Sequence, residues 1–361
     1  MQKKTALFMI DWLGAIGGAE VMMIAPLKEL SQEYNIILVT LRPGNVFTKD
    51  HFTGEKHYSL NMSSRFGVFK AARQLKEIIR KENVTLVHAF LYWSVVVARL
   101  ACGKKTPLVF SLATIMSDHV YKDRWYSFYT KWIDRLTYKK QQVLISPTKE
   151  VYMDFDAAIG IKGPAYVIPN FVMDSFFEKA GSYKTPGVNL KIVAVGNIKP
   201  VKNYQVILDA LQLAGPLPLT IDIYGNGDLT GEQKRQIETH QLPVKQMGSR
   251  SDIHQVMPQY DAFIMSSLHE GFGISVAEAM AIGLPLMLSD IRTLREVSKD
   301  NAFFFNPTDA KSLANAFRSI LDKKEKLRQY SDRGKAIANE HYTKKQYVQQ
   351  LLKVYGQLLN K

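Results

Sequence analysis

The stretch "HEGFGISVAEAMAIGLPLMLSD", residues 269–290, contains most of one strand–helix–strand unit. An apolar run at residues 261–266 precedes it, and a Gly-x-Gly loop then leads into an apolar segment of helical length. A second apolar run follows at residues 284–289. This order predicts two buried parallel strands joined by a helix, with Glu270 just beyond the first strand and Glu278 on the helix.

The same alternation of short apolar runs and longer amphipathic segments extends along the whole chain. Continuous apolar runs are typical of strands that helices cover on both faces of a sheet. These runs are residues 5–10, 35–40, 84–90, 107–112, 142–146, 190–196, 219–225, 261–266, 284–289 and 302–305. Helices are expected between them, for example at residues 68–82, 203–214, 274–283 and 309–322. The pattern predicts an α/β fold with doubly wound parallel sheets.

The alternation restarts near residue 190, after a polar stretch that contains glycine and proline. We therefore expect an N-terminal domain over residues 1–177, a linker over 178–189 and a C-terminal domain over 190–341. Residues 342–361 should form a C-terminal helix, because their apolar residues recur at helical spacing. Such a helix needs a surface, and we expect it to pack back on the N-terminal domain.

The composition fits a two-domain globular protein. The chain has 361 residues, and 46% of them are hydrophobic. Its single cysteine, Cys102, excludes an internal disulfide framework and is typical of a reducing compartment. No apolar run reaches the roughly 18 residues of a membrane span, and the run after Met1 is too short for a signal peptide. We expect a cytoplasmic protein, either free or peripheral on the cytosolic face of a membrane.

The formal net charge is +14. Residues 1–175 hold 23 Lys and Arg against 15 Asp and Glu, and residues 176–361 hold 24 against 18, so both halves are basic. Such surfaces attract nucleic acid, anionic lipid or phosphorylated small molecules. No clustered nucleic-acid motif accompanies the charge, so we expect no nucleic-acid partner.

Two more loops follow predicted strands and could bind phosphate or sugar. Gly17 and Gly18 precede a predicted helix, whose first N–H groups would suit an anion. A strand–helix turn without a ligand is the alternative. Lys199 and Lys202 lie in the loop after residue 196, before a helix for which Asn203 is the expected N-cap. They suit a diphosphate, with ordinary solvated lysines as the alternative.

Carboxylates are the other candidate ligand groups. A carboxylate can accept two hydrogen bonds from the paired hydroxyls of a ribose or hexose, which suits Glu270 and Glu278. A solvated surface acid is the alternative for Glu278, but its apolar neighbours make an unpaired acid costly. The Asp-x-Asp at 154–156 lies in a polar segment that we expect to be exposed, and the histidines lack metal-ligand spacing. We expect no metal site, and a Gly-x-Ser-x-Gly hydrolase motif is missing.

Eight short motifs occur in the order typical of the retaining glycosyltransferases of family 4. They are "GGAE" (17–20), "VHAF" (87–90), "ISPTKEV" (145–151), "VIPNFVMDSFF" (167–177), "VGNIKPVKN" (195–203), "YGNGD" (224–228), "MGSRSDI" (247–253) and "EGFGISVAEAMAIGLPLMLSDI" (270–291). The last, with two acids separated by seven residues, is the most specific. The chain resembles this family over nearly its whole length. The resemblance implies the GT-B architecture, with two Rossmann-like doubly wound parallel-sheet domains and a cleft between them.

The resemblance also implies roles for individual residues. Glu270 would orient the donor hexose, Glu278 would bind the ribose, and Lys202 would neutralise charge on the departing diphosphate. The donor site would further include Gly196, Asn197, Lys199, Gly225, Gly248, Arg250, Gly271, Phe272 and Gly273. Gly17 and Gly18 would approach the phosphates or the acceptor. His88 and His119 would lie on the acceptor side.

The implied reaction moves a hexose from a UDP- or GDP-linked sugar to a glycan or lipid-linked acceptor, in surface polysaccharide or glycolipid synthesis. It would proceed with retention, without a metal and without a resident cofactor, because the nucleotide sugar is a substrate. Two positions depart from the family pattern: Asn197 stands where Arg is common, and Ala113 where His is common. They leave open an inactive GT-B module that binds nucleotide sugar or scaffolds a partner enzyme.

Residues 121–140 interleave aromatic and basic side chains. This combination suits the headgroup region of an anionic membrane, which would be a third partner beside donor and acceptor. Trp125, Phe128, Trp132 and Leu136 fall at helical spacing, so the alternative is that they form the buried face of a helix.

Overall fold

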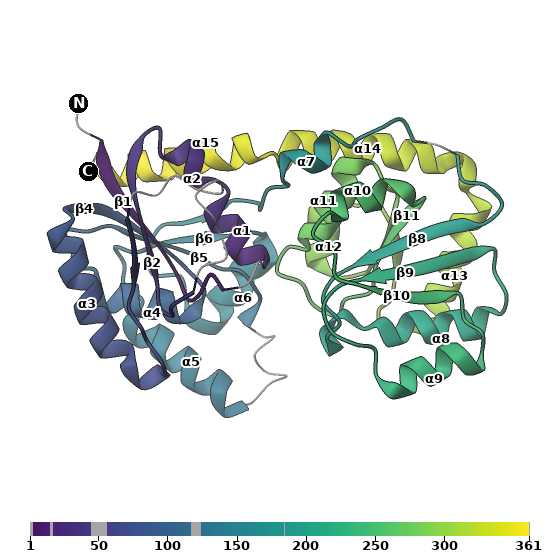
Figure 1. Cartoon of the computed structure of the whole chain (residues 1–361), viewed down its shortest axis with the longest axis horizontal. Coiled ribbons are helices and arrows are strands. Elements are labelled where there is room, and N and C mark those ends of the chain that lie inside the picture. The colour runs from purple at the N-terminus through teal and green to yellow at the C-terminus, as the bar shows by residue number, and fades with distance from the viewer. Residues whose placement is uncertain (1–2, 15–16, 45–55, 117–123, 184, 361) are drawn as a thin grey trace. The chain divides into compact units, whose positions relative to one another are not determined.

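A computed structural model describes residues 3–14, 17–44, 56–116, 124–183 and 185–360; the side chains of residues 124–127 are not described. The chain divides into two compact units. The first unit contains residues 1–170 together with 344–361, and the second contains residues 171–343. Each unit is a parallel sheet covered by helices (Figure 1).

The first unit has a seven-stranded sheet with the strand order β3-β2-β1-β4-β5-β6-β7. Its strands are β1 (Lys4–Ile10), β2 (Tyr34–Thr40), β3 (Lys56–Ser59), β4 (Val84–Phe90), β5 (Leu108–Ser111), β6 (Val143–Ser146) and β7 (Ala165–Val167). Every adjacent pair is parallel. This arrangement confirms the doubly wound α/β fold that the continuous apolar runs predict.

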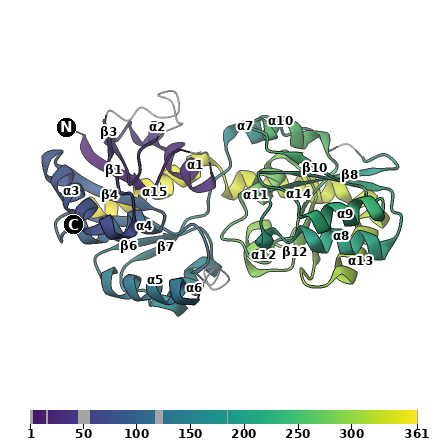
Figure 2. The ribbon, with the colours of Figure 1, turned by 60° about the horizontal axis from the view of Figure 1, so that its bottom comes forward.

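Alternate residues of each strand face opposite sides of this sheet. Leu7 and Met9 of β1 belong to a core against which four helices pack, three through buried residues and α5 through the partly buried Ile133. These helices are α3 (Val68–Lys81), α4 (Tyr92–Ala101), α5 (Arg124–Thr137) and α6 (Lys149–Ile159). Figure 2 shows α5 and α6 side by side. Phe8 points to the other face, where its ring lies 6.5 Å from that of Tyr355.

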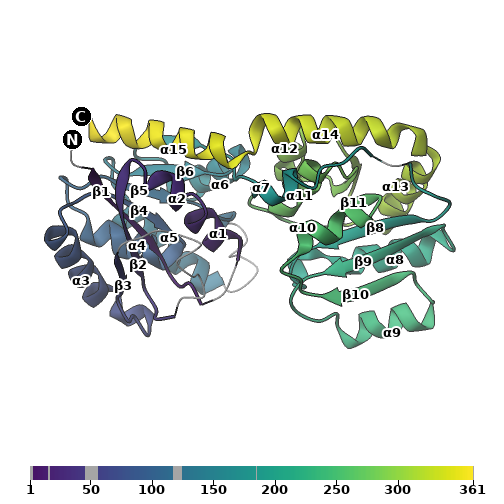
Figure 3. The same ribbon diagram turned by 45° about the horizontal axis from the view of Figure 1, so that its top comes forward.

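The C-terminal helix α15 (Lys344–Leu359) belongs to the first unit. It packs beside α2 (Leu27–Leu30) and β4 (Figure 3). Tyr347, Leu351 and Tyr355 are buried, and Lys344 forms a 2.7 Å ion pair with Glu29. The apolar residues that recur at helical spacing in the tail therefore form the face of α15 that packs against the first unit.

The second unit has a six-stranded parallel sheet with the order β10-β9-β8-β11-β12-β13. The strands are β8 (Leu190–Val195), β9 (Leu219–Tyr224), β10 (Val244–Gly248), β11 (Ala262–Met265), β12 (Leu286–Ser289) and β13 (Phe303–Phe305). One face packs against α8 (Tyr204–Ala214) and α13 (Ala310–Asp322). The other packs against α7 (Asp174–Phe177), α11 (Ile274–Ile282), α12 (Arg292–Ser298) and α14 (Leu327–His341).

The division of the chain differs from the expected boundary at residue 177. Residues 171–177 belong to the second unit, where Phe176 of α7 is buried in its core. The segment expected as a linker also lies against this unit, since the Tyr183 hydroxyl donates to Asp261 O at 3.0 Å. Lys335 Nζ likewise donates to Gly181 O at 3.1 Å. Composition marked this segment as polar, but its hydrogen bonds attach it to the second unit.

The surface of α5 corrects one expectation. Phe128, Trp132 and Leu136 are exposed, so the alternative that they form a buried helix face is wrong for these three residues. Trp125 lies among the residues whose side chains are not described. None of the described helices has both the length and the apolar character needed to cross a bilayer.

Candidate active site

The carboxyl ends of β8, β9 and β10 carry loops that are hydrogen-bonded to one another. Gly196 N donates to Tyr224 O at 2.8 Å, and Gly225 N donates to Gly248 O at 3.0 Å. A Cβ on Gly225 would lie 2.0 Å from Gly196 O, so only glycine allows this approach. Gly225 therefore has a structural role, because it allows the loops after β8 and β9 to pack closely.

Lys202 and Glu270 form an ion pair next to Gly196. Lys202 ends a short helix (Pro200–Lys202) after β8, and Glu270 follows β11. Their Nζ and Oε1 atoms are 2.6 Å apart, and both side chains are partly buried. The Ser267 hydroxyl donates to the same Oε1 at 2.6 Å. The pair places one positive and one negative group at adjoining strand ends, where open parallel sheets bind ligands.

Further hydrogen bonds fix the two loops that hold this pair. Leu268 N donates to Val201 O at 2.9 Å, and the Ser266 hydroxyl donates to Lys202 O at 2.8 Å. The Tyr204 hydroxyl donates to Gly196 O at 3.0 Å. Burial, together with the charge of Glu270, raises the pKa of Tyr204, which therefore stays a neutral donor. The loops are held as one rigid piece.

Asn203 does not cap α8 with its side chain as the sequence predicts. It stands at the N-cap position of α8 but in a left-handed conformation, with φ 51°, and its side chain does not cap the helix. Instead, Nδ2 donates to Pro307 O at 2.7 Å. The residue therefore links the Lys202 loop to the segment after β13. Lys199 and Asn197 are exposed, and Asn197 Oδ1 accepts from Asn226 N at 3.2 Å.

The Gly271–Gly273 loop leads directly into α11. Gly273 has φ 79°, a left-handed conformation that favours glycine. Phe272 is buried, and its ring lies edge-on to that of Tyr342 at 5.4 Å. The Thr293 hydroxyl donates to Glu270 O at 2.9 Å. The loop thus places the N-terminus of α11, the positive end of the helix dipole, directly after Glu270.

Glu278 lies on the only incompletely buried face of α11, which it shares with Ile274 and Ser275. The Ser275 hydroxyl donates to Val195 O at 3.1 Å, so this face is turned toward the end of β8. No hydrogen bond of the Glu278 carboxylate is found within the described residues. A small part of the side chain is exposed, but protein surrounds most of it, and this burial raises its pKa to about 7.

Arg250 and Gly248 lie at the end of β10. Arg250 is held by Asp252 through two hydrogen bonds, from Nε at 2.8 Å and from Nη2 at 2.6 Å. Gly248 has φ 76°. The second unit therefore gathers most of the donor-site residues that the sequence predicts at the ends of β8, β9, β10 and β11. It also adds Ser267 and Tyr204, which no motif marked.

In the first unit, Gly17 stands at the N-cap of α1 (Gly18–Ile24). The Glu20 carboxylate folds back on this turn and accepts from the backbone N–H groups of Gly17 and Glu20. Burial and the nearby charge of Asp11 raise the pKa of Glu20. The Glu20 carboxylate therefore lies where an anion would bind at this helix start, and the role of Gly17 and Gly18 stays a prediction.

His88 is fully buried in β4, with Nδ1 2.6 Å from the Tyr355 hydroxyl and Nε2 2.8 Å from Ser111 Oγ. Burial lowers its pKa to about 3, so the ring is neutral. This placement gives His88 a structural part and does not support the acceptor-side prediction. His119 lies outside the described residues. No group of three or more His, Cys, Asp or Glu side chains with metal-site geometry occurs in the described part of the chain.

Comparisons with known proteins agree with this arrangement. Residues 175–337 match the family model "Glycosyl transferases group 1", and residues 16–176 match "Glycosyltransferase Family 4". Together the two models span both units.

Two curated relatives and one solved structure illustrate the similarity. An Escherichia coli UDP-Gal:α-D-GlcNAc-diphosphoundecaprenol α-1,3-galactosyltransferase is 25% identical over 281 residues, which is 71% of each chain. A Campylobacter jejuni N,N'-diacetylbacillosaminyl-diphospho-undecaprenol α-1,3-N-acetylgalactosaminyltransferase is 30% identical over 118 residues, 32% of this chain and 31% of the relative. Anabaena HepE, solved with UDP and glucose, superposes with a TM-score of 0.78 at 20% identity, over 98% of this chain and 100% of its own.

The structural match shows the fold, and the two family models together match residues 16–337, which contain every strand of both sheets except β1. The motif with the two acids, Glu270 and Glu278, lies within the matched residues 175–337. On these grounds the chain belongs to the family 4 glycosyltransferases, the enzymes with two Rossmann-like parallel-sheet units of the GT-B type.

Proposed function

We propose that this glycosyltransferase moves a hexose from a UDP-sugar to a lipid-linked glycan acceptor, with retention and without a divalent metal, in the synthesis of a surface polysaccharide or glycolipid. The observation that carries the proposal is the Lys202–Glu270 pair beside the Gly271–Gly273 loop. A cation, a carboxylate and the N-terminus of a helix at one sheet edge match the charged, hydroxyl-rich groups of a nucleotide sugar.

The names of the relatives support the choice of substrates. The Escherichia coli relative is named for UDP-Gal and a diphosphoundecaprenol-linked acceptor, and the Campylobacter relative for an acceptor of the same lipid class. Both are named for α linkages. If the sugar of the donor is α-linked to its diphosphate, formation of an α-linked product would be a reaction with retention, and for this reason retention is part of the proposal.

In the proposed reaction, the bond between the sugar C1 and the diphosphate oxygen breaks as C1 bonds to an acceptor hydroxyl oxygen on the same face. The proton of that hydroxyl passes to the departing diphosphate. The Lys202 ammonium stabilises the negative charge that develops there, and this is why we propose that no metal is needed. Glu270 orients the sugar hydroxyls, while Glu278 accepts from the ribose hydroxyls.

Donor turnover without an acceptor tests this function. The wild type is incubated with UDP-hexoses and, in parallel, GDP-hexoses, and release of the nucleoside diphosphate is followed. Slow hydrolysis of a UDP-hexose, unchanged by EDTA, is expected. Loss of turnover in EDTA that Mg²⁺ or Mn²⁺ restores would contradict metal independence. NMR of the anomeric proton in the product of an acceptor reaction decides between retention and inversion.

The alternative of an inactive nucleotide-sugar module predicts a different outcome. Such a protein would bind UDP in calorimetry but release none from any donor. Asn197 motivates this comparison, because an exposed amide stands where a second cation is common. Calorimetry and turnover on the same preparation separate the two functions.

A further inference from the structure

Exposed aromatic and aliphatic side chains gather on two helical segments of the first unit. On α5, Phe128, Trp132 and Leu136 are 68%, 55% and 60% exposed and recur every four residues. Just before and at the start of α3, Phe66 and Phe69 are 84% and 78% exposed. Single exposed apolar residues are ordinary, but a group of this size marks an interaction surface.

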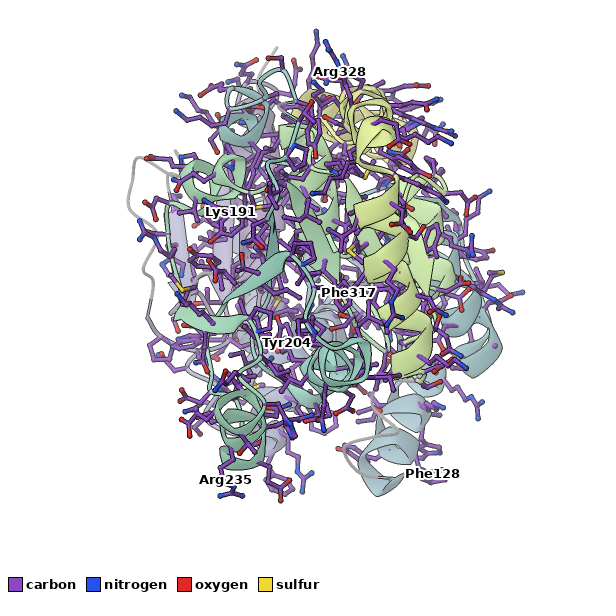
Figure 4. The ribbon with its side chains drawn as sticks, turned by 90° about the vertical axis from the view of Figure 1, so that its right-hand side faces the viewer. Phe128, Lys191, Tyr204, Arg235, Phe317 and Arg328 are labelled. Carbon is purple, nitrogen blue, oxygen red and sulfur yellow. The ribbon has the colours of Figure 1, made fainter. Side chains whose placement is uncertain are left out.

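Arg65 joins the two segments. Its guanidinium carbon lies 5.5 Å from the ring centre of Phe66 and 6.0 Å from that of Tyr129 on α5. Tyr129 is itself exposed, so the two groups adjoin. Figure 4 shows Phe128 on the outer side of α5. We call the joined group the aromatic–basic surface; its apolar members are Phe66, Phe69, Phe128, Tyr129, Trp132 and Leu136.

The charge around this surface is mainly positive, although Glu77, one turn along α3, lies 3.7 Å from Arg73. Residues 61–76 contain no Asp or Glu, and residues 128–149 contain only Asp134, which is buried. The basic residues of the same two stretches, all at least partly exposed, are Arg65, Lys70, Arg73, Lys76, Lys131, Arg135, Lys139, Lys140 and Lys149. The excess of basic side chains over acidic ones would attract an anionic partner to this surface.

The exposure of the rings is not a sign of a loosely packed helix. The inward face of α5 carries Asp134, which forms a buried ion pair with Arg99 of α4. The Arg99 guanidinium also lies 4.4 Å from the Phe110 ring centre and 5.1 Å from that of Tyr138. Because α5 is anchored on this side, the rings on its other side are held in solvent.

We propose that the aromatic–basic surface docks the protein on an anionic lipid bilayer. Aromatic rings suit the headgroup region, and surrounding Lys and Arg add attraction to anionic lipid. A helix that spans the membrane is not required for this attachment. This docking rests on the proposed function in one respect: a lipid-linked acceptor is anchored in the membrane, and an enzyme docked there would reach it.

Co-sedimentation with lipid vesicles tests the docking, without nucleotide or acceptor. Neutral phosphatidylcholine vesicles are compared with vesicles that contain increasing phosphatidylglycerol, at low and high salt. Binding should rise with phosphatidylglycerol and fall in high salt. Phe66→Ser/Trp132→Ser should weaken binding about tenfold or more. Lys70→Ala/Lys76→Ala should weaken it by about fivefold for each charge removed.

Matched variants in the second unit serve as controls. Leu213→Ser removes another exposed apolar side chain, and Lys234→Ala/Arg235→Ala removes two exposed charges of α9 (Gly231–Thr239). Both should bind vesicles like the wild type. Equal binding to neutral vesicles, or wild-type binding by the surface variants, would overturn the proposal. A wild-type dimer in sedimentation velocity that Phe66→Ser/Trp132→Ser abolishes would assign the surface to self-association instead.

The same preparations separate this inference from the proposed function. UDP calorimetry and donor hydrolysis depend on the second unit, so the surface variants should keep both. Vesicle binding that fails while UDP binds normally refutes only the docking. Failure of the wild type to turn over any nucleotide sugar refutes only the proposed function.

Discussion

Lys202 Nζ lies 2.6 Å from Oε1 of Glu270, so the two charges proposed to handle the donor are in direct contact with each other. Ser267 shares the same carboxylate oxygen. Electrostatic groups that are already in place cost little reorganisation when charge develops in a reaction. The contact keeps the ammonium positioned, and it gives the diphosphate a defined cation to which it can bind.

Lys202→Ala should lower turnover by about 10²-fold or more, because the charge that stabilises the leaving diphosphate is lost. Steady-state release of UDP from the best donor measures the change. Lys191→Ala is the matched control, since Lys191 is exposed near the opposite end of β8. Turnover within a few-fold of wild type in Lys202→Ala would move the role to Lys199.

Glu270→Ala and Glu278→Ala should affect different steps. Glu278→Ala should weaken UDP binding by about tenfold or more, since hydrogen bonds to a charged group contribute about 1.5–3 kcal/mol. Glu270→Ala should bind UDP nearly as wild type and lose turnover. Calorimetry with UDP alone, followed by donor hydrolysis, shows the split. Unchanged UDP affinity in Glu278→Ala would exclude the ribose contact.

The raised pKa of Glu278 predicts a pH-dependent stability. In the folded state its pKa is about 7, against an ordinary value of 4.5, so the folded protein binds this proton more tightly. The associated stability is complete below pH 4.5 and is lost as the pH rises through 7. Over this window the wild type should lose about 3 kcal/mol of unfolding free energy relative to Glu278→Gln. Urea denaturation of both proteins at several pH values measures the difference, and parallel curves would contradict the assignment.

Asp134→Ala should destabilise the first unit by about 3–5 kcal/mol, because it leaves the buried Arg99 charge without its partner. Urea unfolding followed by tryptophan fluorescence can detect this loss. Replacement of both partners, as in Arg99→Met/Asp134→Leu, should recover much of it. A double variant as unstable as the single one would show that the ion pair itself is required.

The sequence predicts the central strands well and the edge strands poorly. β1, β8 and β11 are buried on both faces and read as continuous apolar runs. Of the edge strands, β3 and β10 include no continuous apolar run, as in "KHYS" for β3, and β7 has only the three residues "AYV". The edge strand β13 is the exception, because its sequence "FFF" is an apolar run that the sequence analysis identifies. The pairing of the other three depends on the neighbouring strand, which no local pattern contains.

The candidate site shows the same limit. Glu270 and Glu278 lie in one short motif and Lys202 lies in another, so the motifs locate these residues. Ser267 and Tyr204 join them through tertiary contacts, and neither residue belongs to a distinctive pattern. The fold of the Glu20 carboxylate onto Gly17 is likewise a side-chain conformation, which a Gly-Gly sequence does not reveal.

The chain passes from the first unit to the second after residue 170 and returns after residue 343. This path determines which unit can complete its fold first during synthesis. Residues 171–343 are contiguous, and Val172 pairs with Thr343 where the segment begins and ends, so the second unit can close once residue 343 has been made. The first unit begins earlier but cannot be completed until α15 follows and brings Tyr355 to His88. On the ribosome, the half translated first is therefore finished last, and the sheet face that α15 covers stays exposed until then.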